Sequence, residues 1–112
     1  MATTATTHQW VGKSGETYKY HVYELRFSFA ANQPGNYIFA KLNALGQWVP
    51  QYIGQTKDLK DRLNDHEKEA CAKSNGATHI HAHLNRTEAA RLAEEKDLIE
   101  KHNPHCNTQH AH

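Results

Sequence analysis

Regular alternation of apolar and polar residues marks two parts of the chain. Residues 9–25 show it around a Ser-Gly turn, and the pattern predicts two short strands joined as an N-terminal β-hairpin. Residues 79–84 show it again, with apolar side chains on one face and three histidines on the other. Between them, residues 37–42 and 47–54 flank a turn and predict a second hairpin. Pro50 in its second arm indicates an edge strand or a bulge.

Two other stretches show the apolar spacing of amphipathic helices. The first runs from a cap at Thr56 or Asp58 to about residue 72. The second covers residues 88–102 and is stopped by Asn103-Pro104. After the N-terminal hairpin the element order is therefore β-β-α-β-α. This order predicts an α+β fold, in which a small central antiparallel sheet of about three strands is flanked by helices and carries an extra N-terminal hairpin.

A chain of 112 residues is expected to form one domain. We assign residues 1–8 to a disordered lead, residues 9–107 to the domain and residues 108–112 to a flexible tail. Within the domain, residues 9–30 form the hairpin extension and residues 33–107 the core. Only 38% of the residues are hydrophobic, which agrees with loosely held ends.

The cysteines and the N-terminus bear on location. Cys71 and Cys106 lie far apart and in no CxxC spacing, so we expect thiols in a reducing compartment, with no disulfide framework or zinc site. The first residues show no basic segment followed by an apolar one, and no apolar run approaches the ~18 residues of a membrane span. These features predict a cytoplasmic protein without a membrane segment.

The net charge of +1 does not by itself indicate a nucleic-acid partner. Lys57, Lys60 and Arg62, however, cluster just after the second hairpin. A local basic patch of this kind is enough to hold a phosphate backbone.

Several short motifs follow one another from the second hairpin to the end of the second helix. They are Pro34-Gly35-Asn36-Tyr37, Tyr52-Ile53-Gly54, Lys57-Asp58-Leu59 with Arg62, Glu95-Lys96-Asp97-Leu98-Ile99, and Pro104 with Asn107. In this order and element context they resemble the GIY-YIG nuclease domain family over roughly residues 33–107. Two positions depart from the family pattern: Asn36 replaces an apolar residue, and Gln55 stands where some members carry lysine.

The resemblance implies a metal-dependent DNA endonuclease that hydrolyses phosphodiester bonds with a tyrosine-assisted water and one divalent cation, Mg²⁺ or Mn²⁺. The implied catalytic residues are Tyr37, Tyr52, Arg62, His66 and Glu95, with Glu95 as the metal ligand and Tyr37 as general base. The implied substrate-binding residues are Gly54, Lys57, Lys60 and Asn107. The expected partner is DNA, single- or double-stranded, and the expected state is a monomer or weak dimer.

Elementary chemistry supports the role of Glu95. It follows Leu92 by three residues and precedes Ile99 by four, which places it in the apolar stripe of its helix. A carboxylate there is costly unless it is paired or coordinates a cation. Glu94 is expected to point elsewhere, so it is the natural control. The alternative is a surface ion pair between Glu95 and Arg91 or Lys96.

The other implied residues have physical rationales and alternatives of their own. Arg62 and His66, four residues apart, share a helical face. Arg62 suits a phosphate or a salt bridge to Asp58 or Asp65, and His66 suits proton transfer, phosphate binding or the core. With its reference pKa of ~10, Tyr37 needs a nearby cation to act as a base.

Hairpin geometry tests whether the two tyrosines share a face. A two-residue loop at Ala44-Leu45 pairs Tyr37 with Tyr52 on one face. A type I turn with Gly46 as a bulge needs a second bulge near Pro50 to do the same. We predict a shared face; the alternative is that both are ordinary aromatic residues packed on the helices.

Two alternatives remain at the level of function. The three histidines His79, His81 and His83 share a strand face and offer a rival site for Zn²⁺ or Ni²⁺. The chain as a whole could instead be a weakly catalytic or non-catalytic nucleic-acid-binding module, or a subunit of a DNA repair or restriction complex.

Overall fold

The computed structural model describes residues 6–64 and 66–108. The strands are β1 (Thr7–Val11), β2 (Thr17–Glu24), β3 (Gly35–Leu42), β4 (Trp48–Thr56) and β5 (His79–Leu84). The helices are α1 (Leu59–Leu63), α2 (Glu69–Ser74), α3 (Glu88–His102) and α4 (His105–Thr108). Within these described ranges no helix is long and apolar enough to cross a membrane.

The α+β class is confirmed, but the sheet is larger than the expected three strands. It has five antiparallel strands in the order β1-β2-β5-β3-β4. The N-terminal hairpin is part of this sheet, because β2 pairs with β5. Thr7 and His8, which we assigned to the lead, already pair with β2. Residues 1–5 of the predicted lead and residues 109–112 of the predicted tail lie outside the described part of the chain.

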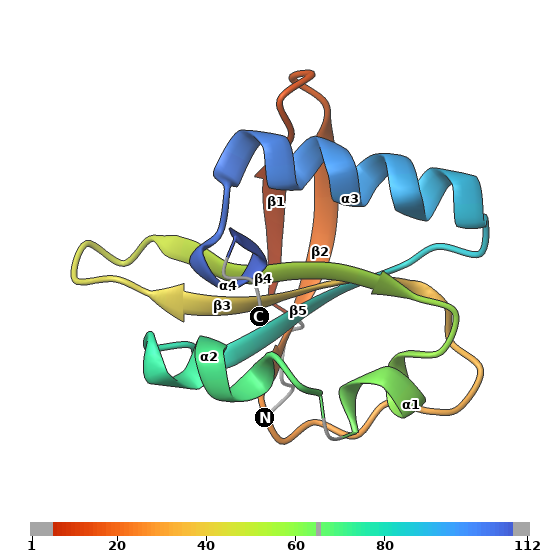
Figure 1. Ribbon diagram of the computed structural model, residues 1–112, viewed down its shortest axis with the longest axis horizontal. Helices are drawn as coiled ribbons and strands as arrows, with labels where there is room; N and C mark the ends of the chain where they lie inside the picture. Colours follow the sequence, from red (N-terminus) through yellow and green to blue (C-terminus); the bar gives the residue numbers. More distant parts are fainter. Residues whose placement is uncertain (1–5, 65, 109–112) are drawn as a thin grey trace.

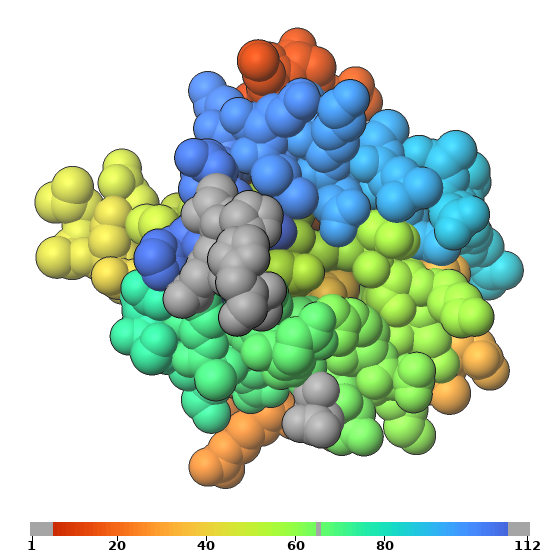
Figure 2. Space-filling view, viewed as in Figure 1, coloured from red at the N-terminus to blue at the C-terminus, as the bar shows by residue number. Residues whose placement is uncertain are grey.

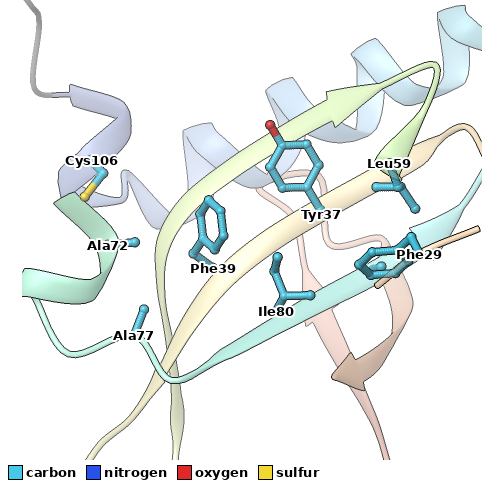
Figure 3. Packing of buried hydrophobic residues seen from close by; sticks show 9 residues of the cluster. Phe29, Tyr37, Phe39, Leu59, Ala72, Ala77, Ile80 and Cys106 are labelled. Atoms are coloured by element: carbon cyan, nitrogen blue, oxygen red, sulfur yellow. The ribbon is translucent and has the colours of Figure 1, made fainter. Parts of the chain in front are cut away.

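Helices cover both faces of the sheet (Figure 1). On the face of α1 and α2, Tyr37 and Phe39 pack in a core with Leu59 and Ala72 (Figure 3). The opposite face carries the second core, in which α3 contributes Leu98; its sheet residues are Trp10, Tyr20, Ile38, Ala40 and Ile53. Successive residues of β3 therefore project into different cores.

The single helix predicted from about residue 58 to residue 72 is wrong: the chain forms α1 and α2 with a break between them. The side chain of Asp58 accepts a hydrogen bond from the Asp61 amide and caps α1 as expected. At the other end, Asn64 adopts an extended conformation and ends the helix. The break places His66 with its side chain in the core, 4% exposed.

The expectation of free thiols is also wrong. Cys71 of α2 and Cys106 of α4 form a disulfide. Sequence spacing does not reveal that the fold brings these two short helices together. The disulfide removes one of the reasons for a cytoplasmic location, because disulfides persist mainly in oxidising compartments. That location remains a prediction.

We predict that loss of the disulfide lowers the free energy of unfolding by about 3–4 kcal/mol, because it closes a loop with a sequence separation of 35. Denaturant unfolding of the wild type with and without dithiothreitol, and of Cys71→Ser, measures the change. Dithiothreitol should leave Cys71→Ser unaffected. Two reactive thiols in the unreduced, denatured wild type would contradict the prediction.

The three histidines of β5 do not form the rival metal site. His81 is fully buried and accepts a hydrogen bond at Nδ1 from the Trp10 indole, at 2.9 Å. His83 instead contacts Glu94. No group of three or more His, Cys, Asp or Glu side chains in residues 6–64 and 66–108 is arranged to hold a metal ion.

The buried His81 predicts a dependence of stability on pH. Burial lowers its pKa to about 3 from 6.5, so the unfolded chain binds the proton more tightly than the folded one. Stability should therefore decrease as the pH falls below 6.5, by on the order of 1–2 kcal/mol between pH 7 and pH 5. In His81→Gln this acid-side decrease should be smaller, and in His21→Gln, at an exposed position, unchanged. Equal slopes in urea titrations of all three proteins would refute the assignment.

Candidate active site

The two tyrosines share one face of the β3–β4 hairpin, as predicted, but in a different register. Tyr37 is opposite Gly54, and Tyr52 is opposite Phe39. Of the two turns considered, the structure has the one with Gly46 as a bulge, where φ is 77°, so the pairing of Tyr37 with Tyr52 that a two-residue loop would give does not occur. A bulge at Gln51, next to Pro50, restores the shared face. The ring centroids of Tyr37 and Tyr52 lie 6.2 Å apart.

Gly54 makes room for Tyr37. A Cβ atom at position 54 would lie 2.6 Å from the Cζ and Oη atoms of Tyr37, closer than real Cβ contacts allow. Any side chain there would displace the phenol. The structure thus gives Gly54 a packing role beside the implied site, and its part in substrate binding stays a prediction.

His66 lies at the break between α1 and α2, with its ring against both tyrosines. Its Nδ1 accepts a hydrogen bond from the Lys68 amide, at 2.9 Å. The ring hydrogen is therefore on Nε2, which lies 2.6 Å from the Tyr37 oxygen and donates to it. Burial, and then the charge of Arg62, lower the pKa of His66 to about 4. At neutral pH His66 is thus a neutral donor to Tyr37.

Arg62 does not stack over His66 on a continuous helix, because α1 ends between them. Its guanidinium instead forms two hydrogen bonds to Glu67, at 2.7 and 2.9 Å. The predicted alternative of a salt bridge to Asp58 is wrong, and Asp65 lies outside the described residues. Arg62 holds the pKa of Glu67 at about 2. Sequence spacing missed this pair, since a separation of five residues is not one that a helix brings together.

Arg62 also acts on the tyrosines. Burial raises the pKa of Tyr37 and of Tyr52 above the ordinary range. The positive charge of Arg62 opposes the rise in both groups. The guanidinium therefore belongs to the same electrostatic environment as the two phenols.

Glu95 comes from α3, on the other side of the edge strand β4. It is half-buried, burial raises its pKa, and its charge raises the pKa of Tyr37 and Tyr52. The described residues give it no ion pair, so the predicted alternative of a surface pair is not what the structure has. Figure 2 shows part of β4 between α3 and the α1–α2 segment.

The reason given for Glu95 from its apolar stripe is wrong. Leu92 of that stripe is 46% exposed, and the buried residues of α3 are Arg91, Glu94 and Leu98. Glu94 does not point away from the protein: it is 3% exposed and faces the sheet. Hydrophobic periodicity missed this face because two of its three residues are charged.

The remaining predicted residues lie around this group. Lys57 and Lys60 are exposed at the start of α1. The side-chain amide of Asn107 forms two hydrogen bonds with the main chain of Ile53, at 2.7 and 2.9 Å. Asn107 therefore fastens α4 to β4 next to Tyr52, and its part in substrate binding stays a prediction.

Glu95 suits a divalent cation. It is a half-buried carboxylate without a cationic partner among the described residues, and a cation would relieve the cost of burying its charge. Mg²⁺ is commonly held by one or two carboxylates together with water and substrate phosphates. A single protein carboxylate is therefore a sufficient starting point for such a site.

Comparisons with known proteins agree with this arrangement. Among curated proteins none matches the chain significantly in sequence. Among solved structures, the N-terminal endonuclease domain of UvrC from Thermotoga maritima bound to magnesium, its catalytic divalent cation, has a TM-score of 0.57 and 28% identity. That match covers 71% of this chain and 89% of the UvrC domain. An asparagine-to-alanine mutant of the same domain has a TM-score of 0.57 and 28% identity, and a tyrosine-to-phenylalanine mutant has a TM-score of 0.56 and 29% identity. Each of these matches covers 72% of this chain and 89% of the UvrC domain.

The family model of the GIY-YIG catalytic domain matches residues 35–109, which is more than half of the chain. The matched segment contains both tyrosines, the arginine and histidine beside them, and the half-buried glutamate of α3. The N-terminal hairpin precedes it. By sequence match and by fold, the chain belongs to the GIY-YIG catalytic domain family.

Proposed function

We propose that this protein is a metal-dependent endonuclease that hydrolyses phosphodiester bonds of DNA at the edge of β4. One observation carries the proposal: the buried phenol of Tyr37, hydrogen-bonded to His66, lies beside the half-buried phenol of Tyr52. Both phenols lie in the field of Arg62 and of the half-buried Glu95, which has no ion pair among the described residues. Phosphodiester hydrolysis needs this combination, because charge builds up on the phosphoryl oxygens while a water is activated.

Glu95 is the residue that would hold the cation. When bound, a divalent cation such as Mg²⁺ or Mn²⁺ neutralises charge on the phosphate and lowers the pKa of a bound water. The relatives of known structure bind a catalytic divalent cation, which supports this assignment.

Tyr37 is proposed as the group that accepts the proton of the attacking water. His66 supports this role by donating its Nε2 hydrogen to the Tyr37 oxygen, a bond that stabilises a phenolate. The imidazole does not act as a base toward Tyr37, because its other nitrogen is already engaged by the Lys68 amide. Tyr52, whose ring lies beside that of Tyr37, is proposed to form a hydrogen bond with the nucleophile or with a phosphate oxygen.

Arg62 is proposed to bind the scissile phosphate in place of Glu67. The two side chains are 32% and 66% exposed, so the pair is accessible to solvent and exchange with a phosphate costs little. A guanidinium binds two phosphate oxygens with the same geometry as a carboxylate. The exposed Lys57 and Lys60 extend the positive surface for the flanking DNA backbone.

Glu95→Gln should abolish metal-dependent cleavage, with a rate at least about 10²–10³-fold below wild type. The reason is that the substitution removes the negative charge that would bind the cation. Plasmid nicking and linearisation with Mg²⁺ or Mn²⁺ measure the rate. Glu100→Gln, at an exposed position of the same helix, is the matched control and should cleave normally. Equal cleavage by both variants would show that Glu95 is not the ligand or that the activity is a contaminant.

His66→Gln should retain cleavage within about tenfold of wild type, because the glutamine amide can still donate to the Tyr37 oxygen. His66→Phe fills similar space but offers no donor, and its rate should fall further, by about 10²-fold or more. Single-turnover cleavage rates of the two variants provide the comparison. Equally large losses in both would indicate that the imidazole itself transfers a proton.

A further inference from the structure

Polar side chains form a row across the sheet on the face covered by α3. In the strand register Asn36 of β3 lies opposite both Gln55 of β4 and His83 of β5. Tyr20 of β2 continues the row, with its ring centroid 5.5 Å from that of His83. We call these four residues the polar row. It borders the apolar core that Ile38 and Leu98 share beneath α3.

Two buried charged residues of α3 bind the polar row. Glu94 accepts a hydrogen bond from the Tyr20 hydroxyl, at 2.6 Å, and its other contact is His83 Nδ1, at 2.9 Å. Arg91, which is 4% exposed, donates from Nε to the Gln55 side-chain oxygen, at 3.0 Å.

The main chain of α3 is bound to the row as well. Asn36 donates from Nδ2 to the carbonyl oxygen of Arg91, at 2.9 Å. This hydrogen bond explains why asparagine stands at position 36 in place of the family's apolar residue, because an apolar side chain could not bind the helix.

These contacts fix the rotation of the helix. Apolar packing tolerates small rotations, whereas a buried charge that loses a hydrogen bond carries a large penalty. Arg91 and Glu94, three residues apart, define the face of α3 that touches the sheet. Glu95 is the next residue, about 100° further round the helix, which brings it to the edge of β4.

We propose that Glu94 and Arg91 are positioning residues that hold α3, through the polar row, in the rotation that presents the Glu95 carboxylate to the candidate site. The inference rests on the proposed function. It assigns a part in metal binding to a glutamate that is buried under the helix and does not itself meet the cation.

The chain offers a matched control. Tyr18, two residues before Tyr20 on β2, also donates its hydroxyl hydrogen to a carboxylate of α3, that of Asp97, at 2.8 Å. Tyr18→Phe and Tyr20→Phe each remove one oxygen that binds the same helix. Only the second of them loosens the buried contact next to Glu95.

The test measures Mn²⁺ affinity by calorimetry, well below the melting temperature, together with kcat for DNA cleavage. Tyr20→Phe and Glu94→Gln should each weaken Mn²⁺ binding and lower kcat by about tenfold, the usual effect of residues that orient a metal ligand. Tyr18→Phe should stay within about twofold of wild type in both, whatever its effect on Tm. The double variant Tyr20→Phe/Glu94→Gln should lose little more than either single variant, since both act through one contact.

Wild-type Mn²⁺ affinity and kcat in folded Tyr20→Phe and Glu94→Gln would overturn the inference, even if both proteins are less stable. If either does not fold, His83→Gln, at a half-buried position, replaces it with the same criterion. The proposed function is tested separately by Glu95→Gln. Mn²⁺ binding that survives Glu95→Gln removes the proposed function and the inference with it. Binding lost in Glu95→Gln but intact in Tyr20→Phe removes only the inference.

Discussion

The burial of β3 between two helical layers is the constraint on which the arrangement depends. Because successive side chains of a strand point to opposite faces, Asn36 must face α3 while Tyr37 faces α1 and α2. These neighbours are both hydrogen-bonded, one to the α3 main chain and the other to His66. A single peptide unit thus connects the helix that carries the proposed metal ligand with the segment that supports the proposed base. A shift of β3 by one residue would exchange the two faces and separate both groups.

Burial changes the pKa of four groups at the candidate site. Burial raises the pKa of Glu95 and of both tyrosines, and it lowers the pKa of His66. Each shift favours the neutral form of its group over the charged one. Arg62 keeps its charge by pairing with Glu67. A bound cation would reverse the balance for the carboxylate and the phenols, which ties the ionisation of the proposed base to metal binding.

The sequence predicted the strands and the long helix α3, because these depend on local patterns. It proposed the site residues from their motifs, and their roles stay predictions. It did not predict the details that depend on contacts between distant segments. The bulge at Gln51 restored the shared face that the turn at Gly46 alone would have removed, and it set Tyr37 opposite Gly54. Asn64 ended α1 early, which replaced the expected stacking of Arg62 and His66 with a hydrogen bond from His66 to Tyr37.

The largest error of interpretation concerned α3. Its buried face contains two charged residues, so the hydrophobic pattern selected the wrong stripe and placed Glu94 outside it. The sequence did not predict the disulfide for a related reason: the pairing of two distant cysteines depends on the fold that brings their helices together. In both cases the missing information is the set of polar or covalent partners that only the sheet topology brings into reach.

The most direct test of the central claim, that these groups converge around one divalent ion, is a crystal structure of the protein soaked with Mn²⁺ and measured for anomalous scattering. We expect one strong anomalous peak bound to the Glu95 carboxylate on the side of Tyr37 and Tyr52. A peak held elsewhere, for example between Glu94 and His83, with none at Glu95, would contradict it.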